Sequence, residues 1–154
     1  MTVTLQDVAV LLGLPIHGSA ISGRANVDIY DYCLRFLDQV LHPSNMKPRC
    51  LSIGWLAKTF DLTKLPTNAT DETIQCYVRA TILRIIGGDL MGSKTEGYVH
   101  DMFFQFVEDL HLMQEYSWGS ACLAYLYRNL CNVVDPYISQ ISGPLLLLQL
   151  WAWE

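Results

Sequence analysis

The chain has 154 residues, enough for one domain with a sizeable core. Its apolar share of 51% is high and its charged share of 16% falls below the average of about 25%, so we expect more apolar surface than one domain covers by itself. Ten scattered basic residues and a net charge of −5 disfavour autonomous nucleic-acid binding, which needs a clustered basic face.

Helix-capping residues mark the first predicted element. Thr4 is followed three positions later by Asp7, the spacing of a capping box, in which each residue satisfies the other's backbone N–H. The helix that starts there is expected to end at Gly13, because glycine readily adopts the left-handed cap conformation. Residues 15–23 are rich in glycine and proline and predict a loop or a small hairpin.

A second helix is predicted from a cap at Asn26 to about Leu41, followed by a short helix capped by Ser52. Asp31 and Arg35 stand four positions apart in the longer helix and predict an exposed ion pair. The apolar residues of the longer helix that follow helical spacing, and are expected to be buried, are Tyr30, Leu34, Leu37 and Leu41.

A third long helix is predicted to start at a cap on Thr70 and to stop at Gly87-Gly88. Residues 89–91 and 98–100 flank a glycine-bounded turn and predict a two-stranded hairpin. The predicted core face of the helix consists of Ile74, Tyr77, Val78, Thr81, Ile82 and Ile85.

Helical spacing returns in the last third of the chain. An apolar stripe runs from Met102 to Leu110, Ser117 is expected to cap a further amphipathic helix, and Pro144 suits the first position of a final helix. The sequence therefore predicts a mainly α single domain over residues 1–154, with about six or seven helices and one or two small β-hairpins.

No group of residues in the sequence indicates catalysis. The five cysteines contain no Cys-x-x-Cys pair, the four histidines have no metal-ligand spacing, and no serine lies in a nucleophile elbow. We expect a protein that is not an enzyme and that uses no cofactor or metal. An odd cysteine count, no signal peptide and no run of about 20 apolar residues indicate a reduced intracellular protein without a membrane span.

The C-terminal segment from Leu145 to Trp153 is apolar on nearly all sides and contains no charged residue. Such a helix is either buried in a core or exposed as a docking surface, and the sequence leaves both interpretations open. Tryptophan is a favoured anchor of protein interfaces. The candidate interface residues are Leu146, Leu147, Leu150, Trp151 and Trp153.

Three segments in fixed order carry a family resemblance: residues 2–15 (TVTLQDVAVLLGLP), residues 116–128 (YSWGSACLAYLYR) and residues 143–154 (GPLLLLQLWAWE). Together they closely resemble the plant mobile domain, a family found in certain plant transposable elements and in MAIN-like (maintenance of meristems) proteins. Members of the family are longer at both ends, which implies that residues 1–154 are a partial or truncated domain.

The resemblance implies a nuclear protein-interaction module that acts in gene regulation, transposable-element silencing and meristem maintenance. The implied partners are a plant type-seven-class serine/threonine phosphatase-like protein, another mobile-domain protein, or a second copy of the chain. The family has been called aminotransferase-like, but no lysine, including Lys94, lies in a phosphate cup suited to pyridoxal phosphate. The alternative is a transposon-derived accessory factor that handles nucleic acid directly, which the negative charge disfavours.

Overall fold

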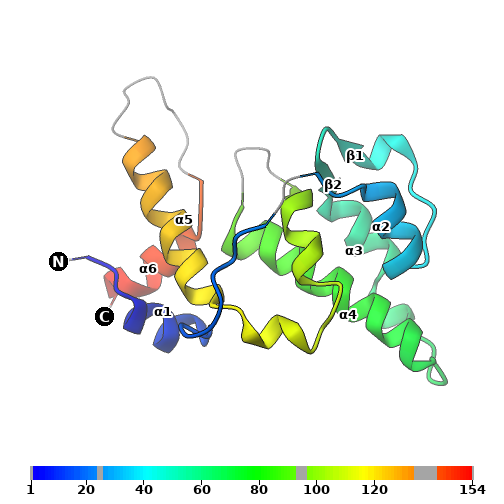
Figure 1. Ribbon diagram of the computed structural model, residues 1–154, viewed down its shortest axis with the longest axis horizontal. Helices are drawn as coiled ribbons and strands as arrows, with labels where there is room; N and C mark the ends of the chain where they lie inside the picture. Colours follow the sequence, from blue (N-terminus) through cyan, green and yellow to red (C-terminus); the bar gives the residue numbers. More distant parts are fainter. Residues whose placement is uncertain (1, 24–25, 93–96, 134–141, 154) are drawn as a thin grey trace.

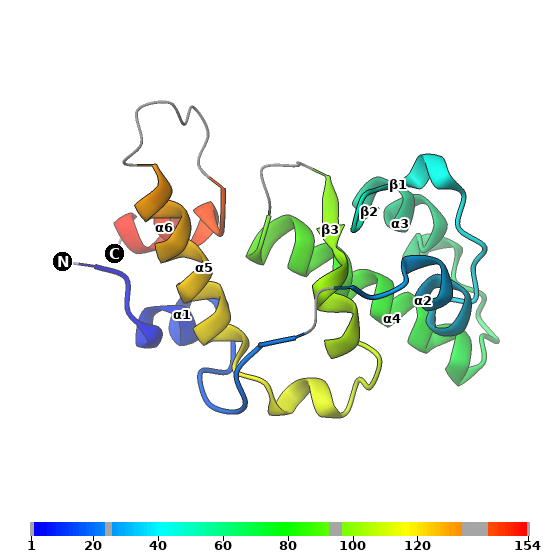
Figure 2. The ribbon, with the colours of Figure 1, turned by 45° about the horizontal axis from the view of Figure 1, so that its top comes forward.

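The computed structural model describes residues 2–23, 26–92, 97–133 and 142–153. Within these residues the chain is mainly α-helical, as predicted, with six α-helices and a small antiparallel sheet. One group of helices lies at the end of the molecule that holds both termini, and the other helices and the sheet form the rest (Figures 1 and 2). The terminal group is α1 (Leu5–Leu12), α5 (Trp118–Asn132) and α6 (Leu145–Trp153); the others are α2 (Ile29–Phe36), α3 (Ile53–Thr59) and α4 (Asp71–Ile85).

Helix α1 begins and ends where the sequence predicts. The backbone N–H of Thr4 donates to the Asp7 carboxylate at 2.6 Å, and the backbone N–H of Asp7 donates to the Thr4 hydroxyl at 3.3 Å. This reciprocal pair is the capping box. Gly13 closes the helix with a φ of +64°, a conformation that glycine adopts without steric cost.

Helix α2 is shorter than predicted and is rotated. The Asp28 carboxylate accepts from two backbone N–H groups and starts the helix, whereas Asn26 has a φ of +139° that no helix tolerates. Tyr32 faces the core because its ring packs against Phe104 at a centroid distance of 4.6 Å. Tyr30 and Leu34, which were predicted to be buried, are instead exposed on the opposite side. Three further predictions are confirmed: Leu37 and Leu41 are buried just beyond the helix, and Asp31 pairs with Arg35 at 3.2 Å.

Helix α4 starts at Thr70, as predicted, but it does not stop at Gly87-Gly88. It continues as one π-helical turn from Ile86 to Leu90. Gly87 is required there by close packing, because a Cβ at this position would lie 2.6 Å from the Cβ of Val99. The glycine therefore serves a tertiary contact and not a helix end.

The sheet joins distant segments, and the predicted hairpin of residues 89–91 with 98–100 is wrong. Strand β3 (Tyr98–His100) pairs with β2 (Cys50–Ser52), and β2 pairs with β1 (Met46–Lys47), all antiparallel. Residues 89–90 belong instead to the π-helical turn. Ser52 ends β2 and caps α3, as predicted, by accepting from the backbone N–H of Trp55.

Residues 15–23 form a loop within which the structure places no hairpin strands. Ser19 in this loop makes an isolated parallel bridge to Tyr116. Residues 101–106 form a 3-10 helix and not the predicted α-helix. Ser117 precedes α5, but its hydroxyl donates to the Ser120 hydroxyl at 2.6 Å and does not cap the backbone.

Two hydrophobic clusters hold the fold together, and α5 belongs to both. Trp118 and Cys122 on its first turns lie in the main core with α2, α3, α4 and the sheet. Leu126, one turn further along, lies in a second cluster at the terminal end of the molecule. This second cluster also contains Val3, Val8, Leu123 and Leu147. It fixes α6 against the rest of the domain.

Candidate functional site: the apolar faces of helices α6 and α4

Helix α6 presents an apolar face outward. Trp153 is 82% exposed and Leu146 is 52% exposed, while Leu150 between them is half-buried. These residues stand at i, i+4 and i+7 and share one side of the helix. We call Leu146, Leu150 and Trp153 the α6 outer face. The segment from 145 to 153 contains no charged residue, so its contact with water is unfavourable along its whole length.

Two of the five candidate interface residues point inward. Leu147 is fully buried in the second cluster and is not part of the exposed surface of α6. Trp151 is half-buried and packs against the same cluster. An all-apolar segment gives no sequence signal for which side faces the core, and that choice is made by α1 and α5.

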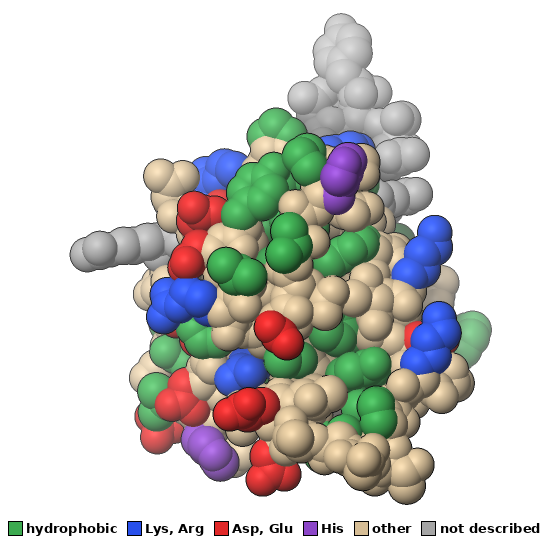
Figure 3. Space-filling model, turned by 90° about the vertical axis from the view of Figure 1, so that its right-hand side faces the viewer, with side chains coloured by type: hydrophobic (Ala, Val, Ile, Leu, Met, Phe, Trp, Pro, Cys, Tyr) green, Lys and Arg blue, Asp and Glu red, His purple; other side chains and the backbone are tan. Residues whose placement is uncertain are grey.

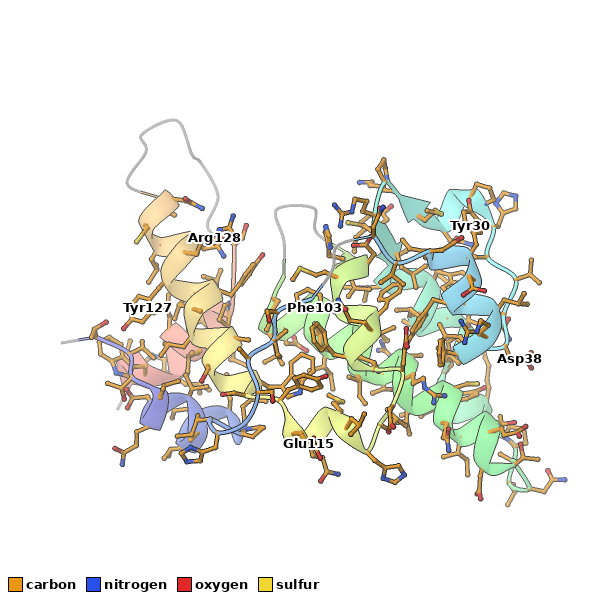
Figure 4. All side chains as sticks on the ribbon, viewed as in Figure 1. Tyr30, Asp38, Phe103, Glu115, Tyr127 and Arg128 are labelled. Carbon is orange, nitrogen blue, oxygen red and sulfur yellow. The ribbon has the colours of Figure 1, made fainter. Side chains whose placement is uncertain are left out.

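The N-terminal segment forms part of the support beneath α6. The Tyr127 hydroxyl of α5 bonds the Val3 carbonyl at 2.5 Å and the Thr2 hydroxyl at 2.6 Å. Tyr127 lies on the side of α5 nearest the N-terminal segment (Figure 4). These bonds hold Val3 in the cluster that receives Leu147. Helix α6 is therefore seated on packed side chains, which makes its outer face a fixed surface.

A second apolar surface lies on α4, where the sequence predicted core. Ile74, Val78 and Ile85 are 40%, 39% and 44% exposed, whereas Ala80 and Leu83 on the other side of the helix are fully buried. The helix is apolar on both faces, and only one of them meets the core. This two-sided pattern is the signal in the sequence that could have indicated a surface.

The exposed side of α4 is concave. It borders a groove of about 400 Å³, and a smaller hollow of about 260 Å³ follows the same helix. Val78 and Ile82 line both, so the two hollows are neighbours along α4. We call the larger one the α4 groove; it is lined by Leu14, Val78, Ile82, Ile85, Leu110 and Met113, among others. Gln114 is its single polar lining residue among those the structure describes.

Several of the described basic side chains are engaged within the protein. Arg49 binds Asp101, Lys64 pairs with Asp61 at 3.8 Å, and Arg79 donates to the carbonyls of Val107 and Glu108. The face of the molecule opposite the termini carries basic and acidic side chains interspersed (Figure 3). Phosphate binding requires basic residues gathered in one stripe, which the described residues do not form.

Two of the cysteine thiols are fully buried. Burial raises the pKa of the Cys33 thiol to about 12 and that of the Cys122 thiol to about 11, so both stay protonated at neutral pH. No three metal-ligating side chains come together within residues 2–23, 26–92, 97–133 and 142–153. No helix in that part of the chain is long and apolar enough to cross a bilayer.

Comparison with known proteins agrees with the resemblance in the sequence. The chain is 40% identical over all its residues to a serine/threonine-protein phosphatase 7 long form homolog of Arabidopsis thaliana, of which the match covers 11%. It is 34% identical to Protein MAIN-LIKE 1 and 31% identical to Protein MAINTENANCE OF MERISTEMS of the same plant, over 99% of the chain and 30% and 32% of those proteins. The chain thus spans at most about a third of these relatives.

No solved structure matches the chain. The profile of the plant mobile domain matches residues 1–154, the whole sequence. The chain therefore belongs to the plant mobile domain family.

Proposed function

We propose that the chain is a non-enzymatic protein-interaction module and that the α6 outer face is its docking surface. The observation that carries the proposal is the exposure of Trp153, 82% of whose surface meets water on a helix fixed in place by Leu147. Burying apolar surface contributes about 25 cal/mol per Å², and tryptophan is among the residues that dominate binding energy at interfaces. A rigid apolar helix with a terminal tryptophan therefore has the composition of an interface centre.

The names of the relatives suggest the setting. One relative is named a phosphatase 7 long form homolog and another MAINTENANCE OF MERISTEMS. We extend the proposal to a nuclear role in gene regulation, transposable-element silencing and meristem maintenance, exercised through a phosphatase-like or mobile-domain partner. In this view the domain supplies binding, and any catalysis belongs to the partner or to other parts of the longer proteins.

The alternative, a transposon-derived factor that handles nucleic acid directly, has less support. The net charge is −5. Arg35 and Arg49 form ion pairs with carboxylates of the protein itself. Strong DNA binding at low salt by the purified chain would favour this alternative over docking.

The test uses purified Arabidopsis phosphatase 7 long form homolog and Protein MAIN-LIKE 1 as probes. We expect at least one to bind the chain, and we expect Leu146→Ala together with Trp153→Ala to weaken binding at least tenfold, since each lost anchor of this kind costs about 2 kcal/mol. Val40→Ala is the matched control, because Val40 is 86% exposed in a loop after α2. Binding that is unchanged in the double variant, or absent for both probes, contradicts the proposal.

A further inference from the structure

The chain exposes two apolar surfaces, and their shapes are complementary. The α6 outer face is a convex helix surface, and the α4 groove is a concave one of about 400 Å³. We propose that the α6 outer face of one copy occupies the α4 groove of a second copy. This inference rests on the proposed docking role of α6 and names one occupant for each surface.

The contact has to form between molecules. Leu147 is fully buried against α1 and α5, so α6 is anchored to its own domain with Leu146 and Trp153 directed away from it. Turning these residues into the groove of the same chain would pull Leu147 out of the second cluster. Exposing a buried leucine in this way is costly, whereas a second copy reaches the groove without any change in the first.

Length and spacing of the two surfaces agree. Helix α6 has nine residues, a length of about 13 Å at 1.5 Å per residue. The residues of α4 that line the α4 groove begin at Val78, and the stretch from Val78 to Ile86 spans about 12 Å by the same rise. An apolar helix that binds a groove uses anchors at i, i+4 and i+7, the positions of Leu146, Leu150 and Trp153.

Charge and polarity agree as well. Neither α6 nor the lining of the α4 groove contains a charged side chain, so the contact buries no unpaired charge. Each surface has one glutamine, Gln149 on α6 and Gln114 in the groove. A primary amide both donates and accepts, so two glutamines can satisfy each other when water is excluded. A partner with a charged helix would leave its charge against an apolar lining.

Two copies can form the contact twice, once in each direction, and the assembly then closes at a dimer. Complementation between two variants tests this arrangement. The first variant, Val78→Asp, places a carboxylate in the groove. The second, Leu146→Ala with Trp153→Ala, removes the anchors. Both are expected to fold, because the replaced residues are exposed. Sedimentation velocity over a concentration series should show a wild-type dimer and at least tenfold weaker self-association for each variant alone.

An equimolar mixture of the two variants should associate more strongly than either one, because one intact groove meets one intact α6. Methyl NMR of the labelled anchor-less variant, titrated with the unlabelled Val78→Asp variant, should shift the signals of Ile82, Ile85 and Ile86, which line the groove. Val40→Asp, an equally drastic change at an exposed valine, should leave the dimer unaffected.

Several results overturn the inference: a wild-type chain that stays monomeric, a Val78→Asp variant that dimerises normally, an open polymer, or a mixture no stronger than its components. If these occur while the α6 variant still loses binding to the Arabidopsis probes, the docking role of α6 stands and only the choice of a second copy fails. If both losses are absent, the docking role fails too.

Discussion

Arg49 and Asp101, 52 positions apart in the sequence, are joined through both their side chains and their backbones. Nε and Nη2 of Arg49 each donate to the Asp101 carboxylate at 3.2 Å, and the Asp101 backbone N–H donates to the Arg49 carbonyl at 2.9 Å. The Asp101 side chain is only 2% exposed. The turn between β1 and β2 is thereby tied to the segment that follows β3.

Removing this arginine should destabilise the domain. Arg49→Ala removes the arginine from a buried carboxylate that still has His100 Nδ1 at 2.9 Å. Breaking a fully buried pair costs about 3–5 kcal/mol, and we expect about 2–3 kcal/mol because the arginine is partly exposed. Urea unfolding measures this loss. Arg49 has a φ of +63°, so Arg49→Gly should recover roughly 1 kcal/mol by relieving backbone strain. Equal stability of wild type and Arg49→Ala contradicts the account of the pair.

The Tyr32 hydroxyl, unlike the Asp101 carboxylate, is a buried polar group whose removal should not destabilise the domain. It is buried and has no hydrogen-bond partner among the described residues, while its ring packs between Phe36 and Phe104. Tyr32→Phe removes an unsatisfied polar atom and keeps the ring, so the free energy of unfolding should stay unchanged or rise by up to about 1 kcal/mol. Tyr32→Ala, which also removes the ring, should cost about 3–5 kcal/mol. Thermal unfolding of both variants checks this, and a large loss in Tyr32→Phe would show a hydrogen bond that matters.

Gly87 and Gly88 form a matched pair of neighbours with different surroundings. A Cβ at Gly87 would lie 2.6 Å from the Cβ of Val99, but a Cβ at Gly88 meets nothing within 4 Å. Gly87→Ala should therefore cost about 1–3 kcal/mol by forcing α4 and β3 apart. Gly88→Ala should be neutral or stabilise by up to about 1 kcal/mol, since alanine loses less backbone entropy than glycine. Chemical denaturation of the two variants should order them in this way; the reverse order would contradict the close contact.

The buried thiols predict how stability depends on alkaline pH. Burial raises the pKa of Cys33 from 9.0 to about 12 and that of Cys122 from 9.0 to about 11. Above pH 9 the unfolded chain loses these protons while the folded chain keeps them, so the free energy of unfolding falls as pH rises. Each thiol contributes a slope of at most about 1.4 kcal/mol per pH unit, up to its folded pKa.

Urea unfolding measures that slope at a series of pH values from pH 8 upward, as far as the protein stays folded. The series covers both sides of pH 9.0, the pKa of the thiol in the unfolded chain. Cys33→Ala should flatten the slope even though it lowers stability at neutral pH. Exposed Cys131 is the control, because Cys131→Ala should leave the slope as it is. A slope that is insensitive to Cys33→Ala would show that this thiol titrates normally in the folded protein.

Local chemistry was predictable from the sequence, and it accounts for what the sequence predicted correctly. The capping box of Thr4 and Asp7 and the caps at Ser52 and Thr70 involve residues three positions apart, so the pattern and the structure coincide. The mainly α fold followed from helical spacing, and the family followed from three segments in fixed order along the chain. The apolar character of α6 was visible too, although the inward turn of Leu147 was not.

The errors share one physical cause, contact between distant segments. The sequence marks Gly87 as a helix stop, but the approach of Val99 from β3 uses that glycine for packing. The pairing of β3 with β2 likewise depends on segments about 50 residues apart, as the partners Leu51 and Val99 show. In α4 the apolar periodicity was detected correctly, but the core lies to one side of the predicted face: Tyr77 and Ile82 pack against the main core, and Ile74, Val78 and Ile85 remain exposed. Periodicity identifies a face and does not say what covers it.

Fluorine NMR of the chain labelled with fluorotryptophan tests the docking role of α6 most directly, since each of the four tryptophans gives its own signal. Variants with one tryptophan replaced by phenylalanine assign the signals. Addition of the partner protein should shift or broaden the Trp153 signal strongly. The signal of Trp55, half-buried on α3 against Phe60, should stay almost unchanged. A partner that binds while the Trp153 signal keeps its position and width would contradict the proposal that α6 is the docking surface.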